Sequence, residues 1–162
     1  KTEYDRHFSE ETHRDIVTFG RCTGLRRREL ARIRGDDLIE KNGRYYLNVT
    51  AGTKGRRSRL SPIVGSDEEI KTVLQLCRTS GHEKIFGKVP HAMDEHGYRR
   101  EYCNRVYQSE KRPIKALSES DRYYCRNDMK GTVYDRRALL IASEALGHSR
   151  ISVIPVNYAP DP

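Results

Sequence analysis

The stretch DLIEKNGRYYLNV, residues 37–49, sets the fold class of this 162-residue chain. Its apolar residues lie on both sides of Asn42-Gly43, a dipeptide typical of a tight two-residue β-turn because both residues tolerate a positive φ. A third short run, SRLSPIV at 58–64, follows after the loop TAGTKGRR. These residues predict a small antiparallel sheet of about three strands.

Helical patterns lie on both sides of this predicted sheet. Ser9 is the expected N-cap of the first helix, Ser66 and Glu69 form a capping box for the third, and Asp135 is the expected N-cap of the last. The polar stretch 117–134 is interpreted as a loop or a hairpin. The expected helices are 8–24, 26–34, 66–81, 94–108 and 135–147. This order predicts an α+β fold: a mainly helical domain with a small three-stranded antiparallel sheet on one side.

The composition favours a polyanionic partner. Lys and Arg number 31 against 23 Asp and Glu, which gives a net charge of +8 and a pI near 9.4. Binding phosphates to such a surface releases condensed counterions, although a basic soluble protein of another kind would show the same charge. No apolar run approaches the roughly 20 residues that a membrane span needs. The four cysteines show no CxxC or CxxH spacing, so we expect no metal site and reduced thiols of a cytoplasmic protein.

The motif HGYR places His96 and Arg99 three residues apart on a predicted helix, so their side chains project from the same face. An arginine can grip the non-bridging oxygens of a phosphodiester while a histidine moves the proton. The two residues could equally belong to an ordinary solvated helix face. This motif alone therefore leaves both interpretations open.

Two further basic segments fit phosphate chemistry. In TGLRRREL, residues 23–30, Arg26 begins a predicted helix where backbone N–H groups attract anions, and Glu29 three residues later can hold it in place. In TAGTKGRRSR, residues 50–59, Lys54 lies in a loop between two strands, where it can follow a DNA backbone or give a proton to a leaving oxygen. Each segment could also be a plain basic surface.

The segment LGHSRISVIPVNYAP, residues 146–160, contributes His148 and, ten residues later, Tyr158. A tyrosine becomes a nucleophile toward phosphorus when neighbouring cations stabilise its anion. The chain has no Walker-type phosphate loop, no Ser-His-Asp order and no acidic cluster arranged for Mg²⁺. We therefore expect no cofactor.

Together and in this order, TGLRRREL, TKGRRSR, HGYR, LGH and the late tyrosine resemble the catalytic domain of the tyrosine recombinase (phage integrase) family. The segments YRREY and LGHSRISV are most similar to integrases of conjugative transposons and related mobile elements. Two features depart from the family pattern. Many members have the tyrosine nine residues after the later histidine, and the interval from Arg99 to His148 is longer here, with Tyr123 and Tyr124 as rival nucleophiles. Pro155 is also expected to interrupt or kink a helix before Tyr158.

The resemblance implies a role for each matching residue. Tyr158 would attack the scissile phosphate and form a 3′-phosphotyrosyl link to DNA, while Lys54 protonates the 5′-hydroxyl and the arginines stabilise the transition state. Because the ester keeps the bond energy, rejoining needs neither ATP nor metal. The implied catalytic residues are Arg26, Lys54, His96, Arg99, His148 and Tyr158, with Glu29 in support. The implied DNA-binding residues are Arg27, Arg56, Arg57, Arg59 and Arg100.

The resemblance also implies a setting. We expect double-stranded DNA at recombination sites as the partner, a tetramer of the full-length protein on that DNA, the bacterial cytoplasm as the location, and neither a membrane nor a small-molecule substrate. Residues 1–162 would be the catalytic domain of a longer integrase whose N-terminal DNA-binding domains are absent here. Two alternatives remain: a metal-independent nuclease in which His96 and His148 are acid and base, and a basic DNA-binding module without catalysis.

Overall fold

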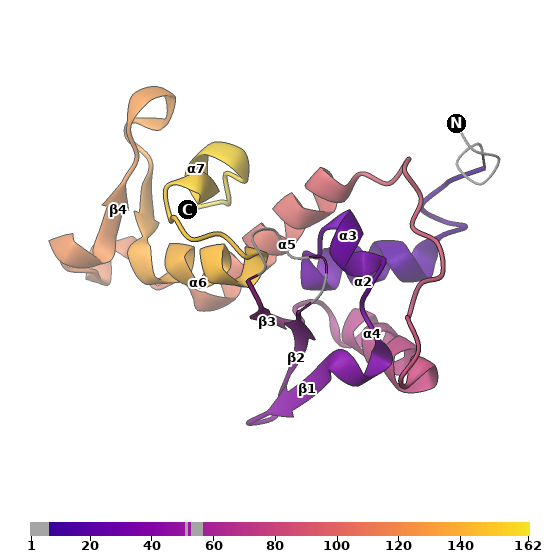
Figure 1. The fold of residues 1–162 in the computed structure, drawn as a ribbon. Helices are drawn as coiled ribbons and strands as arrows, with labels where there is room; N and C mark the ends of the chain where they lie inside the picture. The colour runs from indigo at the N-terminus through magenta and orange to yellow at the C-terminus, as the bar shows by residue number, and fades with distance from the viewer. Residues whose placement is uncertain (1–6, 51, 53–56) are drawn as a thin grey trace.

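The computed structural model of the chain describes residues 7–50, 52 and 57–162 (Figure 1). The predicted site residues Lys54 and Arg56 lie outside the described residues. The helices are α2 (Arg14–Thr23), α3 (Arg27–Leu30), α4 (Asp67–Ser80), α5 (Glu95–Glu110), α6 (Arg136–Leu146) and α7 (Val153–Asn157). The strands are β1 (Leu38–Lys41), β2 (Arg44–Val49), β3 (Arg59–Pro62), β4 (Arg122–Tyr124) and β5 (Val133–Asp135), and short 3₁₀ turns occupy 35–37, 114–116, 119–121 and 127–129. The prediction of an α+β fold is confirmed.

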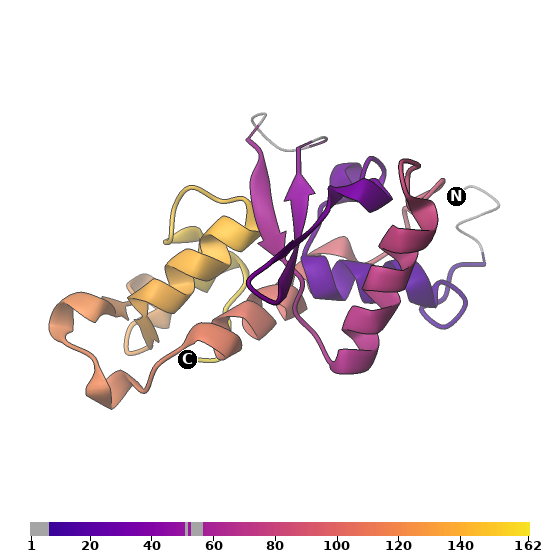
Figure 2. The ribbon, with the colours of Figure 1, turned by 90° about the horizontal axis from the view of Figure 1, so that it is seen from below.

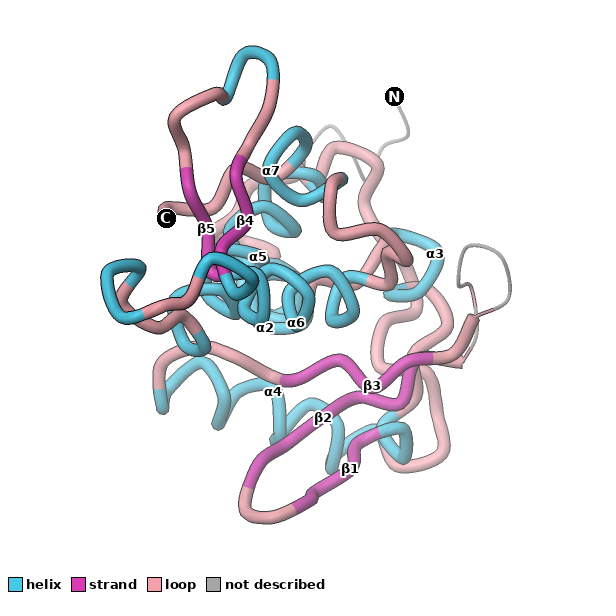
Figure 3. Tube along the Cα trace, turned by 90° about the vertical axis from the view of Figure 1, so that its left-hand side faces the viewer, coloured by secondary structure: helices cyan, strands magenta, loops and turns pink. Residues whose placement is uncertain are grey.

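The three-stranded sheet has the order β1-β2-β3, and both pairs are antiparallel. Asn42 and Gly43 connect β1 to β2 with φ angles of 54° and 75°, as the turn dipeptide predicts. Leu38 lies opposite Leu47, and Leu47 is fully buried. Figure 3 shows this sheet on one side of the molecule, away from the β4–β5 pair.

The sequence signals for helix ends had mixed success. Ser66 accepts a hydrogen bond from Glu69 N, and Asp135 accepts one from Arg137 N, so both predicted caps are confirmed. The prediction for Ser9 is wrong, because α2 begins at Arg14. Ser9 instead accepts from Thr12 N in a preceding turn, which delays the helix by one turn.

The prediction of a helix over 26–34 is wrong in its extent, and the alternative left open for 117–134 is resolved. The segment expected to be helical over 26–34 forms only the single turn α3, because the chain then leaves the helix to pair Arg34 with Lys84. The stretch 117–134, interpreted as a loop or a hairpin, contains an antiparallel hairpin in which Tyr123 lies opposite Tyr134.

Helix α5 joins two hydrophobic clusters. The first cluster contains residues of α2, β2 and α4 and includes Tyr98 of α5, whereas the second contains residues of α6 and α7 and includes Tyr102 and Tyr107 of α5. Figure 2 shows α5 crossing below the sheet between α4 and α6. Residues of α5 between Tyr98 and Tyr102 are therefore held at the boundary of the two clusters.

Candidate active site

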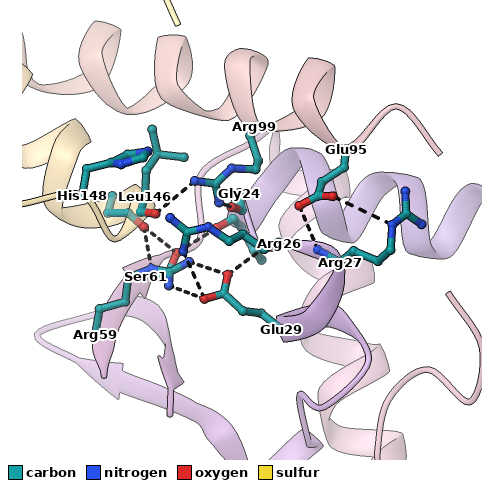
Figure 4. A network of polar contacts seen from close by, with 12 residues as sticks. Gly24, Arg26, Arg27, Glu29, Arg59, Ser61, Glu95, Arg99, Leu146 and His148 are labelled. Carbon is teal, nitrogen blue, oxygen red and sulfur yellow. Dashed lines mark hydrogen bonds and ion pairs between the residues drawn. The ribbon is translucent and has the colours of Figure 1, made fainter. Parts of the chain in front are cut away.

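Arg99 lies at this boundary, and its side chain is directed inward (Figure 4). It is 4% exposed. Its Nη1 donates to the carbonyl oxygen of Gly24, and its Nη2 donates to that of Leu146 at 3.1 Å. Gly24 belongs to the loop after α2, and Leu146 ends α6. The guanidinium is thus fixed by backbone groups from both halves of the fold.

The hydroxyl of Tyr158 meets this guanidinium. Arg99 Nη2 donates to Tyr158 Oη at 3.2 Å, and His148 Nε2 shares a 2.7 Å hydrogen bond with the same oxygen. The ring of His96 lies beside the tyrosine with its centroid 5.7 Å away. Tyr158 is only 5% exposed, so its position is defined by packing as well as by these bonds.

Pro155 does not break the helix before the tyrosine, contrary to the expectation from sequence. It lies in the first turn of α7, where a helix leaves its N–H groups without intrahelical partners, so the missing N–H costs nothing. Helix α7 therefore runs through Pro155, and Tyr158 N still donates to Ile154 O at 2.9 Å. The extra residue between His148 and Tyr158 is accommodated without losing their contact.

Arg26, Glu29 and Arg59 form an ionic network around the buried carboxylate of Glu29 (Figure 4). Glu29 is fully buried and binds both Nη atoms of Arg59 at 2.6 and 2.9 Å. It also accepts from Arg26 N at 2.7 Å and lies 3.5 Å from Arg26 Nη1. Burial alone would raise the pKa of Glu29, but the hydrogen bonds and charges of Arg59 and then Arg26 outweigh it and leave the pKa below its usual value.

The network carries more positive than negative charge. The guanidinium groups of Arg26 and Arg59 share one buried carboxylate, that of Glu29, and the charge of Arg99 also acts on Arg26. Burial and then the nearby charge of Arg99 lower the pKa of Arg26. An anion bound beside Arg26 would relieve this repulsion, so the arrangement suits a phosphate.

An open cavity of about 510 Å³ adjoins the tyrosine side of this network. Arg26, Arg57, His148 and Arg150 are among the residues that line it. Ser149 also lies on its wall. Neither Ser149 nor Arg150 was predicted from the sequence, since a serine and an arginine after a helix carry no distinct signal. A phosphate group entering this cavity would meet several cations.

The remaining predicted residues have different positions. Arg59 lies beneath the site rather than on an open surface, with its Nε donating to Ala145 O at 3.0 Å. Arg27 turns away from the tyrosine and donates to the carbonyl oxygens of Pro90 and His91. Arg100 is exposed on α5, next to the buried Arg99.

The two rival tyrosines are on β4 and have other partners than the residues around Tyr158. Tyr124 donates to Glu119 at 2.8 Å, and the guanidinium of Arg136 lies over the ring of Tyr123. Among the described residues, no group of His, Cys, Asp and Glu side chains is arranged to hold a metal ion, and no helix is long and apolar enough to cross a membrane.

Comparison with known proteins bears on the fold. No family model and no curated protein sequence matches the chain. Among solved structures it is similar to the XerH site-specific recombinase, in a post-cleavage complex with a palindromic difH substrate. The TM-score is 0.54 at 15% identity, and the match covers 93% of this chain but 44% of that one. The chain therefore has a recombinase-like fold and spans less than half of the XerH chain.

Proposed function

We propose that this chain is the catalytic part of a site-specific DNA recombinase that cleaves and rejoins strands through Tyr158. The observation that carries the proposal is the position of the Tyr158 hydroxyl between Arg99 Nη2 and His148 Nε2. A phenol needs two things to attack phosphorus: a group that takes its proton, and cations that stabilise its charge. His148 supplies the first and Arg99 the second.

The reaction then follows from these contacts. Tyr158 Oη attacks the scissile phosphorus and its proton passes to His148 Nε2, while the bond from phosphorus to the 5′ oxygen breaks. The Nη2 hydrogen that Arg99 gave to the phenol becomes free for a non-bridging oxygen of the phosphate. Arg26 binds the phosphate as a second cation. Glu29 keeps Arg26 in place by accepting a hydrogen bond from its backbone N–H. The strand is left as a 3′-phosphotyrosyl ester, and a 5′-hydroxyl attacking that ester reverses the steps.

Other parts of the proposal rest on the sequence resemblance. Lys54 would protonate the leaving 5′ oxygen, and His96 would contact the phosphate from beside the Tyr158 ring. Arg57 on the cavity wall and the exposed Arg100 would contact the backbone of double-stranded DNA, in a tetramer of a longer integrase that moves a transposon-like element. Arg27 and Arg59 would support the site, since both are engaged with neighbouring protein groups.

The test is a nicked DNA substrate that carries the candidate recombination site, because loss of the short strand at the nick traps the covalent ester. We expect a protein–DNA adduct on a denaturing gel that is absent in Tyr158→Phe and present in the matched variant Tyr124→Phe. An adduct that persists in Tyr158→Phe would place the nucleophile elsewhere. Cleaved ends without an adduct would indicate a nuclease, and DNA binding without cleavage would indicate an inactive module.

A further inference from the structure

We propose that residues 159–162, here called the tail clip, fix the Tyr158 hydroxyl beside Arg99 and His148, and that Tyr134 and Asn104 are the positioning residues that hold the clip. The inference rests on the proposed function, because it concerns how the nucleophile of that site is delivered. It extends that function by naming residues outside the active site that position the nucleophile.

The helix that carries Tyr158 is too short to fix it alone. Helix α7 spans five residues, less than the length at which an isolated helix is stable in water. After it, Ala159 adopts a φ of +41°, a left-handed conformation that is uncommon for a residue other than glycine. This turn folds the chain back toward α5. Contacts from outside α7 must therefore keep the turn and the tyrosine in place.

These contacts lie on both sides of the folded-back segment. Tyr134 of β5 donates its hydroxyl to Pro160 O at 2.7 Å. On α5, Asn104 Oδ1 accepts from Asp161 N at 2.9 Å, and Gln108 Nε2 donates to Asp161 O at 2.6 Å. Gln108 also donates to Asn104 Oδ1 at 3.1 Å and so orients that acceptor. Two elements of the same chain thus hold consecutive residues just after Tyr158.

Tyr134 is a rigid anchor for the clip. It is 1% exposed, and its ring packs edge-on against Tyr107 with centroids 5.3 Å apart. The Tyr107 hydroxyl accepts from Asp135 N at 2.9 Å, which ties the ring pair to β5. The interval between Arg99 and His148, which is longer than in the family pattern, therefore supplies the Tyr134 hydroxyl, which binds the segment just after the nucleophile.

The first experiment compares Tyr134→Phe with the matched control Tyr98→Phe, since Tyr98 is also buried and its hydroxyl donates to Glu10 at 3.0 Å in the first cluster. Each variant keeps a buried ring and loses one hydroxyl, but only Tyr134 touches the clip. We expect faster hydrogen exchange at the amides of Ala159 and Asp161, and a shifted ring resonance of Tyr158 in ¹³C-tyrosine NMR spectra, in Tyr134→Phe alone. If Tyr134→Phe does not fold, Asn104→Ala replaces it with the same expectation. Equal exchange and equal Tyr158 resonances in test and control variants would overturn the clip.

Activity gives the second measurement. In Tyr134→Phe we expect single-turnover adduct formation at saturating DNA to fall by about tenfold with unchanged DNA affinity, because positioning acts on the chemical step. Tyr98→Phe should cleave at nearly the native rate. Equal cleavage rates in the two variants would overturn the positioning role. A native chain that forms no adduct would refute the proposed function, whereas the exchange and NMR comparison would still decide the clip.

Discussion

Arg99 Nη2 lies 3.2 Å from Tyr158 Oη, and the other end of the same guanidinium binds the Gly24 carbonyl. Gly24 follows a helix of the first hydrophobic cluster, whereas Tyr158 belongs to the second. One side chain therefore connects the two halves of the fold to the candidate nucleophile. Stability and catalysis should depend on it together.

Replacing Arg99 with alanine tests this connection. The carbonyl oxygens of Gly24 and Leu146 would lose a charged donor, which should lower the free energy of unfolding by about 2–4 kcal/mol. Loss of a cation at the phosphate should slow adduct formation by about 10²–10³-fold or more. Urea unfolding and single-turnover cleavage measure the two effects.

Arg100→Ala is the matched control for Arg99→Ala, because Arg100 is the adjacent residue on the same helix and is exposed. Its unfolding free energy should stay within about 0.5 kcal/mol of native. DNA affinity should fall slightly and lose some of its salt dependence. Equal destabilisation by the two substitutions would contradict the structural role assigned to Arg99.

The buried pair of Glu29 and Arg59 supports a second prediction. Arg59→Met leaves a fully buried carboxylate whose one remaining cationic partner among the described residues is Arg26, so we expect a loss of about 3–5 kcal/mol in unfolding free energy. Adding Glu29→Gln removes the uncompensated charge and should recover part of that loss. Denaturant unfolding of the two single variants and the double variant measures the coupling. Additive losses would show that the two side chains do not stabilise each other.

Much of this fold could be predicted because its signals are local. Asn42-Gly43 fixes a hairpin through two consecutive φ angles, and Ser66 caps a helix through Glu69 only three residues away. The prediction of Ser9 as an N-cap also used a local signal, but it was wrong. The Ser9 side chain does form a local hydrogen bond, but with Thr12 in a turn that precedes the helix.

The partners within the site could not be predicted in the same way. Arg59 looks like any other arginine in a basic loop, and only the fold brings it to Glu29, 30 residues earlier. The order of the motifs predicted that Arg26, Arg99 and Tyr158 lie in one site, because the family that the motifs resemble brings the matching residues together in its fold. Tyr134 carried no such indication, since it donates to a backbone oxygen 26 residues later.

Asp135 should give the chain a distinct acid sensitivity. Hydrogen bonds from Arg112 lower the pKa of Asp135 to about 2, below the usual value of about 3.9. A lowered pKa means that the ionised form stabilises the fold above pH about 4, and that this stabilisation is lost as pH falls toward 2. The difference in unfolding free energy between native and Asp135→Asn should therefore be constant near neutral pH and shrink below pH 4. Urea unfolding at a series of pH values measures it, and a difference that is independent of pH would contradict the assignment.

Gly147 sits where α6 ends and the site begins. Its φ of +83° disfavours any side chain, and a Cβ there would lie 3.0 Å from Arg59 Nη1 and 3.2 Å from Arg26 Nη1. Gly147→Ala should lower the unfolding free energy by about 1–2 kcal/mol through the backbone. It should also displace the arginines and slow adduct formation by about tenfold.

Gly43→Ala separates these two effects of Gly147→Ala. Gly43 has a similar φ of +75°, but nothing lies within 4 Å of its added Cβ. We therefore expect a similar loss of stability and native adduct formation at a temperature where both variants are folded. If Gly43→Ala slowed cleavage as much as Gly147→Ala, the effect would come from backbone strain rather than from the approach of Gly147 to the two arginines. Native cleavage by both variants would mean that Arg26 and Arg59 tolerate a methyl group at position 147.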